Sequence, residues 1–211
     1  ECILKSIHTD PHRRYDSAQD MGLAIEGLPG SSSSILKGYL GSGDRSRQHV
    51  SAGRGSLRSE PARVMLKDIR TKLRLDELFR PVDYMRQNFE TRGVLAAYEK
   101  NSGLCWQRRG TGFTLNWRQA KEYVAQLNDL KWQGRSSWRL PTLEEFRSIL
   151  KPPLRGGLSS AWPLFGDQVH WLWTSDHCNK KQAWVVDVVE SYFDRLDKDG
   201  AASVCAISSP D

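Results

Sequence analysis

The sequence predicts an α+β domain in residues 57–211, preceded by short helices and a flexible linker. From residue 57 onward, apolar residues recur in turn with helical and with strand-like spacing. All eight tryptophans fall between Trp106 and Trp184, so the largest core residues belong to this part of the chain. Residues 29–56 are rich in glycine and serine and nearly lack aromatic residues, which is typical of a flexible linker.

Residues 1–28 have the spacing of two short helices that are interrupted at Asp10-Pro11. Two such helices cannot bury a core alone, so we expect them to belong to something larger. Helical spacing returns in residues 57–90, where Pro61 suits the first turn of a helix. A further helical turn is expected at residues 76–79. The apolar face of the helix that is expected to begin near Pro61 carries Ala62, Met65, Leu66, Ile69 and Leu73.

Two reciprocal capping signals predict where the helices of the domain begin. Asn116 with Gln119 forms one capping pair, and Thr142 with Glu145 forms another. Apolar residues follow each cap at helical spacing. They are Ala120, Tyr123, Val124 and Leu127 after the first cap, and Leu143, Phe146 and Leu150 after the second.

The remaining apolar segments are short and predict a small, mostly antiparallel sheet. Asp197-Lys198-Asp199-Gly200 is a strong turn signal between the last two of these segments. The expected strands are residues 94–98, 104–107, 172–174, 183–189, 192–196 and 203–207.

Charge and hydropathy exclude some classes of protein. The net charge is +6, but no block of the chain concentrates it, so we predict a solvated mixed surface and no nucleic-acid partner. No apolar run approaches the roughly 20 residues of a membrane helix, so we predict no membrane span. We also expect no signal peptide, and we interpret Glu1 as the start of a fragment or of a processed chain.

Cysteines and histidines show no clear catalytic or metal-binding pattern. The four cysteines are widely spaced, which favours buried, reduced thiols; a disulfide from Cys105 to Cys178 or Cys205 is the alternative and needs an oxidising compartment. His170, His177 and Cys178 lack the paired short spacings of a zinc site, so we predict no metal and no cofactor. Catalysis by Cys178 or Cys205 remains an alternative.

Leu4-Lys5, the run Asp10-Pro11-His12-Arg13-Arg14-Tyr15-Asp16-Ser17-Ala18 and Met21 resemble the last two helices of a bacterial serine/threonine protein kinase domain. The alternative is a chance pair of helices. The resemblance implies that Arg14 pairs with a glutamate that lies upstream of this chain. The glycine-rich loop, the ATP-binding lysine and the catalytic motifs of kinases are not in the sequence, so we predict that this chain has no kinase activity.

A series of motifs in residues 57–208 is similar to the Lcl C-terminal domain family. Its most specific member is Trp138-Arg139-Leu140-Pro141-Thr142-Leu143-Glu144-Glu145, and Trp173-Thr174-Ser175-Asp176 and Trp184-Val185-Val186-Asp187 follow in order. The resemblance implies a C-type-lectin-like scaffold that acts as a binding module, as found on bacterial surface proteins, adhesins and kinases, without catalysis of its own.

Three departures from the family pattern bear on the ligand. Ser137 stands where an aspartate is usual, so Arg139 needs another partner. Glu190-Ser191 replaces an expected glycine. The closing strand reads Val204-Cys205-Ala206-Ile207 and lacks both usual arginines, so any anion recognition through those arginines is lost in this chain.

The candidate binding surface lies within residues 173–195, because aromatic, amide and charged side chains mixed together suit a polar ligand or a peptide. The candidate binding residues are Trp173, Asp176, His177, Asn179, Lys180, Lys181, Tyr192 and Arg195. We expect purely structural roles for Trp106, Trp117, Trp138, Arg139, Thr142, Glu145 and Trp184.

These observations predict a non-catalytic recognition module, joined to the end of a bacterial kinase and used for substrate recruitment or regulation. Its ligand would be a protein, a polar small molecule or a glycan. Without a membrane span after residues 1–28, the module would share the cytoplasm with the kinase. The alternative is a surface or secreted lectin or adhesin, with residues 1–28 unrelated to kinases.

Overall fold

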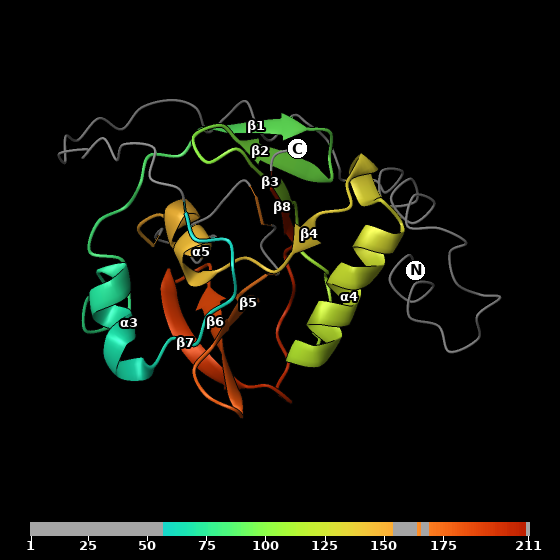
Figure 1. The fold of residues 1–211 in the computed structure, drawn as a ribbon. Helices are drawn as coiled ribbons and strands as arrows, with labels where there is room; N and C mark the ends of the chain where they lie inside the picture. The colour runs from blue at the N-terminus through green and yellow to red at the C-terminus, as the bar shows by residue number, and fades with distance from the viewer. Residues whose placement is uncertain (1–56, 154–163, 166–168, 210–211) are drawn as a thin grey trace. The chain divides into compact units, whose positions relative to one another are not determined.

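The computed structural model describes residues 57–153, 164–165 and 169–209. All of them belong to one compact unit, His49–Asp211. The predictions for residues 1–28 and 29–56 lie outside the described residues. The described part combines helices with two antiparallel sheets, which confirms the α+β class (Figure 1).

The first sheet has the strand order β1-β2-β3-β8-β4. Strand β3 is where the sequence placed it, whereas β2 begins two residues later than expected, and β1 and β4 were not anticipated. Only the end of the expected strand 203–207 is a strand, because residues 202–206 run between the two sheets and bridge to both. The bounds are β1 Phe89–Arg92, β2 Ala96–Glu99, β3 Leu104–Gln107, β4 Trp138–Arg139 and β8 Ile207–Ser208.

The second sheet has the order β5-β6-β7, with β5 at Trp171–His177, β6 at Gln182–Asp187 and β7 at Tyr192–Asp197. The sequence predicted all three strands, although β5 runs three residues further than expected. The sheets are joined through Ser203, whose backbone N–H donates to the carbonyl of Trp171 at 2.9 Å and whose carbonyl accepts from the N–H of Trp173 at 3.0 Å.

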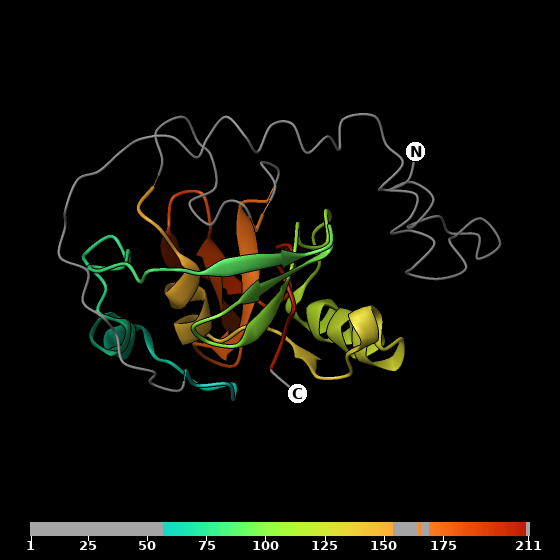
Figure 2. The same cartoon turned by 90° about the horizontal axis from the view of Figure 1, so that it is seen from above.

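Helices α4 (Trp117–Asp129) and α5 (Leu143–Ile149) begin at the two predicted capping boxes, and both boxes are complete. Helix α3 spans Leu66–Leu73, so the expected start at Pro61 is wrong. Residues 62–64 pair with β5 instead, which leaves their backbone groups unavailable for a helix. Residues 76–79 form a turn held by the Asp76 carboxylate and no helix. Helices α3 and α4 lie on opposite sides of the sheets (Figures 1 and 2).

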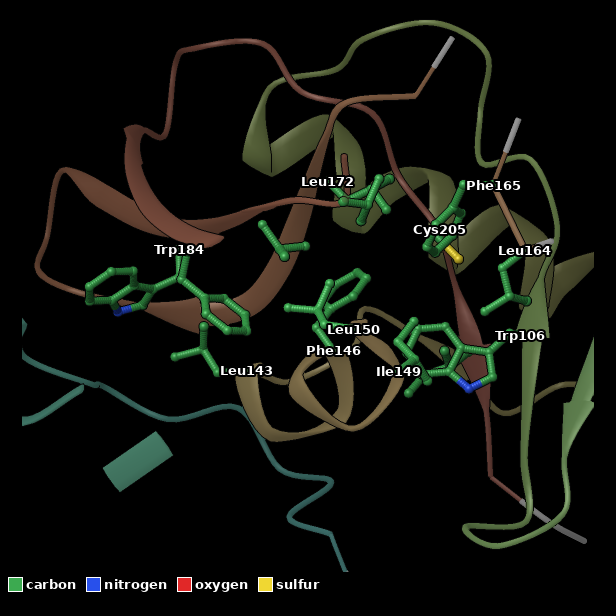
Figure 3. Close-up of a cluster of buried hydrophobic side chains, with 14 of the residues drawn as sticks. Trp106, Leu143, Phe146, Ile149, Leu150, Leu164, Phe165, Leu172, Trp184 and Cys205 are labelled. Carbon is green, nitrogen blue, oxygen red and sulfur yellow. The ribbon is translucent and has the colours of Figure 1, made fainter. Parts of the chain in front are cut away.

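Helix α5 fills the space between the two sheets. Figure 3 shows its apolar side chains between Trp184 of β6 and Trp106 of β3. The rings of Trp106 and Phe146 are 5.6 Å apart, and both side chains are fully buried. Each large side chain buried in this way contributes about 1.5–3 kcal/mol. The short helix therefore holds the two sheets in a fixed relation.

The Trp138–Glu145 run belongs to the scaffold. The Trp138 indole N–H donates to the carbonyl of Trp132 at 2.9 Å. Arg139 binds both carboxylate oxygens of Glu145, at 2.7 and 2.5 Å. One of those oxygens also accepts from the N–H of Thr142, so Glu145 caps α5 and neutralises Arg139 at once. Glu145 is thus the other partner that Arg139 needs when Ser137 replaces the usual aspartate.

Candidate ligand-binding site

Two of the eight candidate binding residues are buried. Strand β5 has an irregular register between Trp173 and His177, and this irregularity turns Asp176 inward. Trp173 has no exposed surface, and its indole N–H donates to the carbonyl of Leu115 at 2.6 Å. Trp173 and Asp176 cannot reach a ligand at the surface, which corrects the prediction that placed them there.

Asp176 instead holds the N-terminal segment of the domain against β5. Its carboxylate accepts from both terminal nitrogens of Arg58, at 2.8 and 2.7 Å, and from the backbone N–H groups of Ala62 and Leu143, at 2.7 and 2.8 Å. Burial would lower the pKa of Arg58, but its bonds to Asp176 and Glu144 raise the pKa above its ordinary value. The Arg58 guanidinium is therefore positively charged at every physiological pH.

Tyr192 and Arg195 do not join the other candidates. They are three residues apart on β7, so their side chains point to opposite faces of the sheet. Tyr192 lies in a T-shaped contact with Trp171, with ring centroids 5.3 Å apart, at the end of the sheet remote from His177. Arg195 is exposed opposite Trp184.

The turn between β5 and β6 keeps its lysines exposed. The Asn179 side chain accepts from the backbone N–H groups of Lys181 and Gln182, at 2.8 and 2.9 Å, so its amide shapes the turn. Lys180 and Lys181 are exposed. The carbonyl of Lys181 accepts from the N–H of Lys198 at 2.8 Å, which brings the β5–β6 turn beside the turn after β7.

A cationic cluster gathers around Trp117 at this end of the sheet. The ammonium nitrogens of Lys121 and Lys198 lie 3.6 and 4.5 Å from the centre of the Trp117 ring. The His177 ring is 6.3 Å from the same indole. The indole N–H donates to the carbonyl of Thr174 at 2.9 Å, which holds the ring in place. We call Trp117, Lys121, His177, Lys198 and Arg63 the Trp117 cluster.

Arg63 reaches the Trp117 cluster through an added strand pairing. The N–H of Val64 donates to the carbonyl of His177 at 2.9 Å, and the N–H of His177 donates to the carbonyl of Ala62 at 3.1 Å. These bonds form a short parallel bridge that sets Arg63 beside His177. The Arg63 side chain is exposed, and its Nε donates to the carbonyl of Cys178 at 3.3 Å.

The cluster has an excess of positive charge. Partial burial lowers the pKa of His177, and Lys198, Arg63 and Lys121 lower it further, whereas Asp176 opposes them. Partial burial and the neighbouring Lys198 also lower the pKa of Lys121. Within residues 57–153 and 169–209, no carboxylate forms an ion pair with Arg63, Lys121, His177 or Lys198. An anion placed here would relieve repulsion that the free protein retains.

The sequence pointed to only part of this cluster. His177 was a candidate, but Trp117 was given a structural role, and Arg63, Lys121 and Lys198 were not singled out. The local signals were the cap at Asn116 and the turn around Lys198, and neither shows that the two segments meet. The two segments meet at a hydrogen bond from the backbone N–H of Trp117 to the carbonyl of Lys198, which is 2.9 Å long and joins residues 81 positions apart.

The cysteines of the described part are placed for packing. Cys178 and Cys205 are free, buried thiols, so neither forms the disulfide that was the alternative. The Cys205 thiol donates to the carbonyl of Gln107 at 3.0 Å. Burial, and to a lesser extent Cys105, raise the pKa of Cys205. A protonated, inaccessible thiol is a poor nucleophile.

The residues that the structure describes contain neither a metal-ion site nor a membrane helix. No three His, Cys, Asp or Glu side chains in this part of the chain are grouped so as to hold a metal ion. None of its helices has the length and hydrophobicity that crossing a bilayer requires.

Comparison with known families decides the identity of the domain. The Lcl C-terminal domain family matches residues 96–208, which is more than half of the chain. The chain belongs to the Lcl C-terminal domain family. No curated protein matches it. The Trp117 cluster lies inside the matched residues except for Arg63, which precedes them.

Proposed function

We propose that this Lcl C-terminal domain is a non-catalytic recognition module that binds an anionic group at the Trp117 cluster. The observation that carries the proposal is the convergence of Lys121, His177 and Lys198 on one indole, with Arg63 beside His177 and no carboxylate of the described residues paired to any of the four. These four residues come from four separate segments of the chain. Side chains that repel one another are costly to keep together, and a bound anion would offset that cost.

The contacts with the indole favour recognition of charge over stacking of a neutral sugar. Each ammonium group over a tryptophan face is stabilised by about 0.5–1 kcal/mol at an exposed site. Lys121 and Lys198 are thereby preorganised, which lowers the loss of side-chain entropy when a ligand binds. The same contacts occupy ring surface on which a sugar would otherwise stack. A phosphate, sulfate or carboxylate group on a protein, small molecule or glycan fits this arrangement.

The wider setting of the module is also a proposal. We propose a C-type-lectin-like scaffold, supported by the two antiparallel sheets with α4 and α5. We propose that the module is cytoplasmic and follows a bacterial serine/threonine kinase, supported by the Asp10–Ala18 run. The free, buried Cys178 and Cys205 are typical of a reducing compartment. In the surface or secreted alternative, the same cluster would meet an extracellular anion.

Calorimetric titration of the full chain with inorganic pyrophosphate at low salt tests the binding proposal. We expect the double variant Lys121→Gln/Lys198→Gln to bind about tenfold more weakly, since each exposed charge contributes up to about 1 kcal/mol. The matched control is Lys67→Gln/Lys72→Gln on α3, which removes two exposed charges away from the cluster. Equal losses in both double variants would show that only net charge matters and would overturn the proposal.

A further inference from the structure

We propose that residues 57–64 complete the anion site, so that anion binding and docking of this segment on β5 stabilise each other. The inference rests on the proposed function, because it names a segment of this chain, residues 57–64, that would control the same site. The segment precedes the residues that the family match covers, and in chain order it follows the linker-like residues 29–56.

The first support is the way the segment docks. Residues 62–64 add a short parallel strand to β5 through the two backbone bonds to His177, which are 2.9 and 3.1 Å long. The carbonyl of Val64 also accepts from the indole N–H of Trp184, at 2.8 Å. His177 thus contributes its backbone to docking and its imidazole to the Trp117 cluster. A change at one of these contacts is transmitted directly to the other.

The second support is the anchor at Arg58. Its guanidinium lies between Asp176 and Glu144, and its carbonyl accepts from the Thr142 hydroxyl at 2.8 Å. About a quarter of the Arg58 side chain remains exposed, at 27%. The anchor is therefore strong in hydrogen bonds yet open to water on one side. Loss of this anchor would weaken the hold of β5 on the segment, although Val64 would still pack in the apolar core.

The third support is the charge that the segment brings. Arg63 is exposed beside His177, so docking of the segment adds one more positive charge, and with it repulsion, to the Trp117 cluster. An anion held by Lys121, Lys198 and Arg63 would turn this repulsion into attraction. Because coupling between two binding events is reciprocal, a ligand that favours docking is itself bound more tightly by the docked form.

Hydrogen exchange of the full chain with and without inorganic pyrophosphate tests the coupling. We expect saturating pyrophosphate to slow exchange at the backbone amides of Ala62 and Val64 by about three- to fivefold, as for one exposed charge contact. Arg63→Gln should remove this extra protection and weaken binding by a similar factor. Arg58→Ala should speed exchange at both amides and also weaken binding, although Arg58 is not itself in the cluster.

The variants and outcomes separate the two proposals. If Arg58→Ala does not fold, Arg58→Lys retains the charge and loses the two-pronged bond to Asp176, and we expect the same effects in milder form. The partly exposed Arg80, which pairs with Glu190, supplies the control Arg80→Ala, which should change neither quantity. Pyrophosphate binding without added protection at Ala62 and Val64, and with native affinity in the Arg58 variants, would overturn the coupling alone. No binding by the native chain would overturn the anion site and the coupling together.

Discussion

Replacing Asp176 with asparagine should be among the most destabilising polar substitutions in this domain. The carboxylate has no exposed surface and accepts four hydrogen bonds, two from Arg58 and one each from the N–H groups of Ala62 and Leu143. Asparagine has nearly the same size, but its amide NH2 group would face donors instead of accepting from them.

The magnitude follows from what remains after the substitution. Breaking a buried ion pair by removing one partner costs about 3–5 kcal/mol. Arg58 retains Glu144 and is partly exposed, so its charge is not stranded, and the lower end of this range applies. Two backbone donors also lose a charged acceptor, although the asparagine oxygen can still serve one of them. We therefore expect a loss of about 3 kcal/mol in the free energy of unfolding.

Urea denaturation of the full chain at pH 7, followed by tryptophan fluorescence, measures this loss. The matched control is Asp194→Asn, an exposed residue on β7, which should change the free energy of unfolding by less than about 0.5 kcal/mol. A cycle with Arg58→Gln then isolates the ion pair. If Asp176→Asn costs less than about 1 kcal/mol, or if the effects of the two substitutions are additive, the ion pair between Arg58 and Asp176 does not hold residues 57–64 against β5.

Three further predictions concern single groups. Thr142→Ala should cost about 1–2 kcal/mol in urea denaturation, because it removes the cap of α5 and a bond to Arg58; a cost no larger than that of an exposed Thr71→Ala would contradict this. In an NMR titration, the pKa of His177 should lie below 6.5, because partial burial and its cationic neighbours lower it, and Lys198→Gln should raise it; an unchanged value would refute the repulsion. Cys205 should resist a thiol reagent in the folded chain and react after unfolding, and rapid labelling of the folded chain would disprove its burial.

Elements with strong local signals could be predicted from the sequence. The capping boxes at Asn116 and Thr142 mark the first turns of α4 and α5, because the capping side chains bond to backbone groups only three residues away. The run from Leu104 to Gln107 is a strand as expected. Elements that depend on a distant partner were missed. Strand β4 is only two residues long and exists because Ile207 and Ser208 pair with it.

The candidate site was predicted less well than the fold. The spacing of Trp173 and Asp176 does not predict that both side chains are buried, or that the register of β5 is irregular between Trp173 and His177. Trp117 begins a helix and was given a purely structural role. It is only partly buried, and its ring is accessible to two lysines.

The sequence by itself determined the class of the domain, its family resemblance, the first turns of α4 and α5, and the apolar faces that form the core. These features depend on periodicity and on bonds within a few residues, which each segment carries on its own. The tertiary structure alone decided that Asp176 is an internal anchor, and that Arg63, Lys121, His177 and Lys198 share one surface. Both results depend on contacts between segments far apart in the chain. Residue type records such contacts only weakly, because a lysine on a solvated face and a lysine in a binding site have the same local sequence pattern.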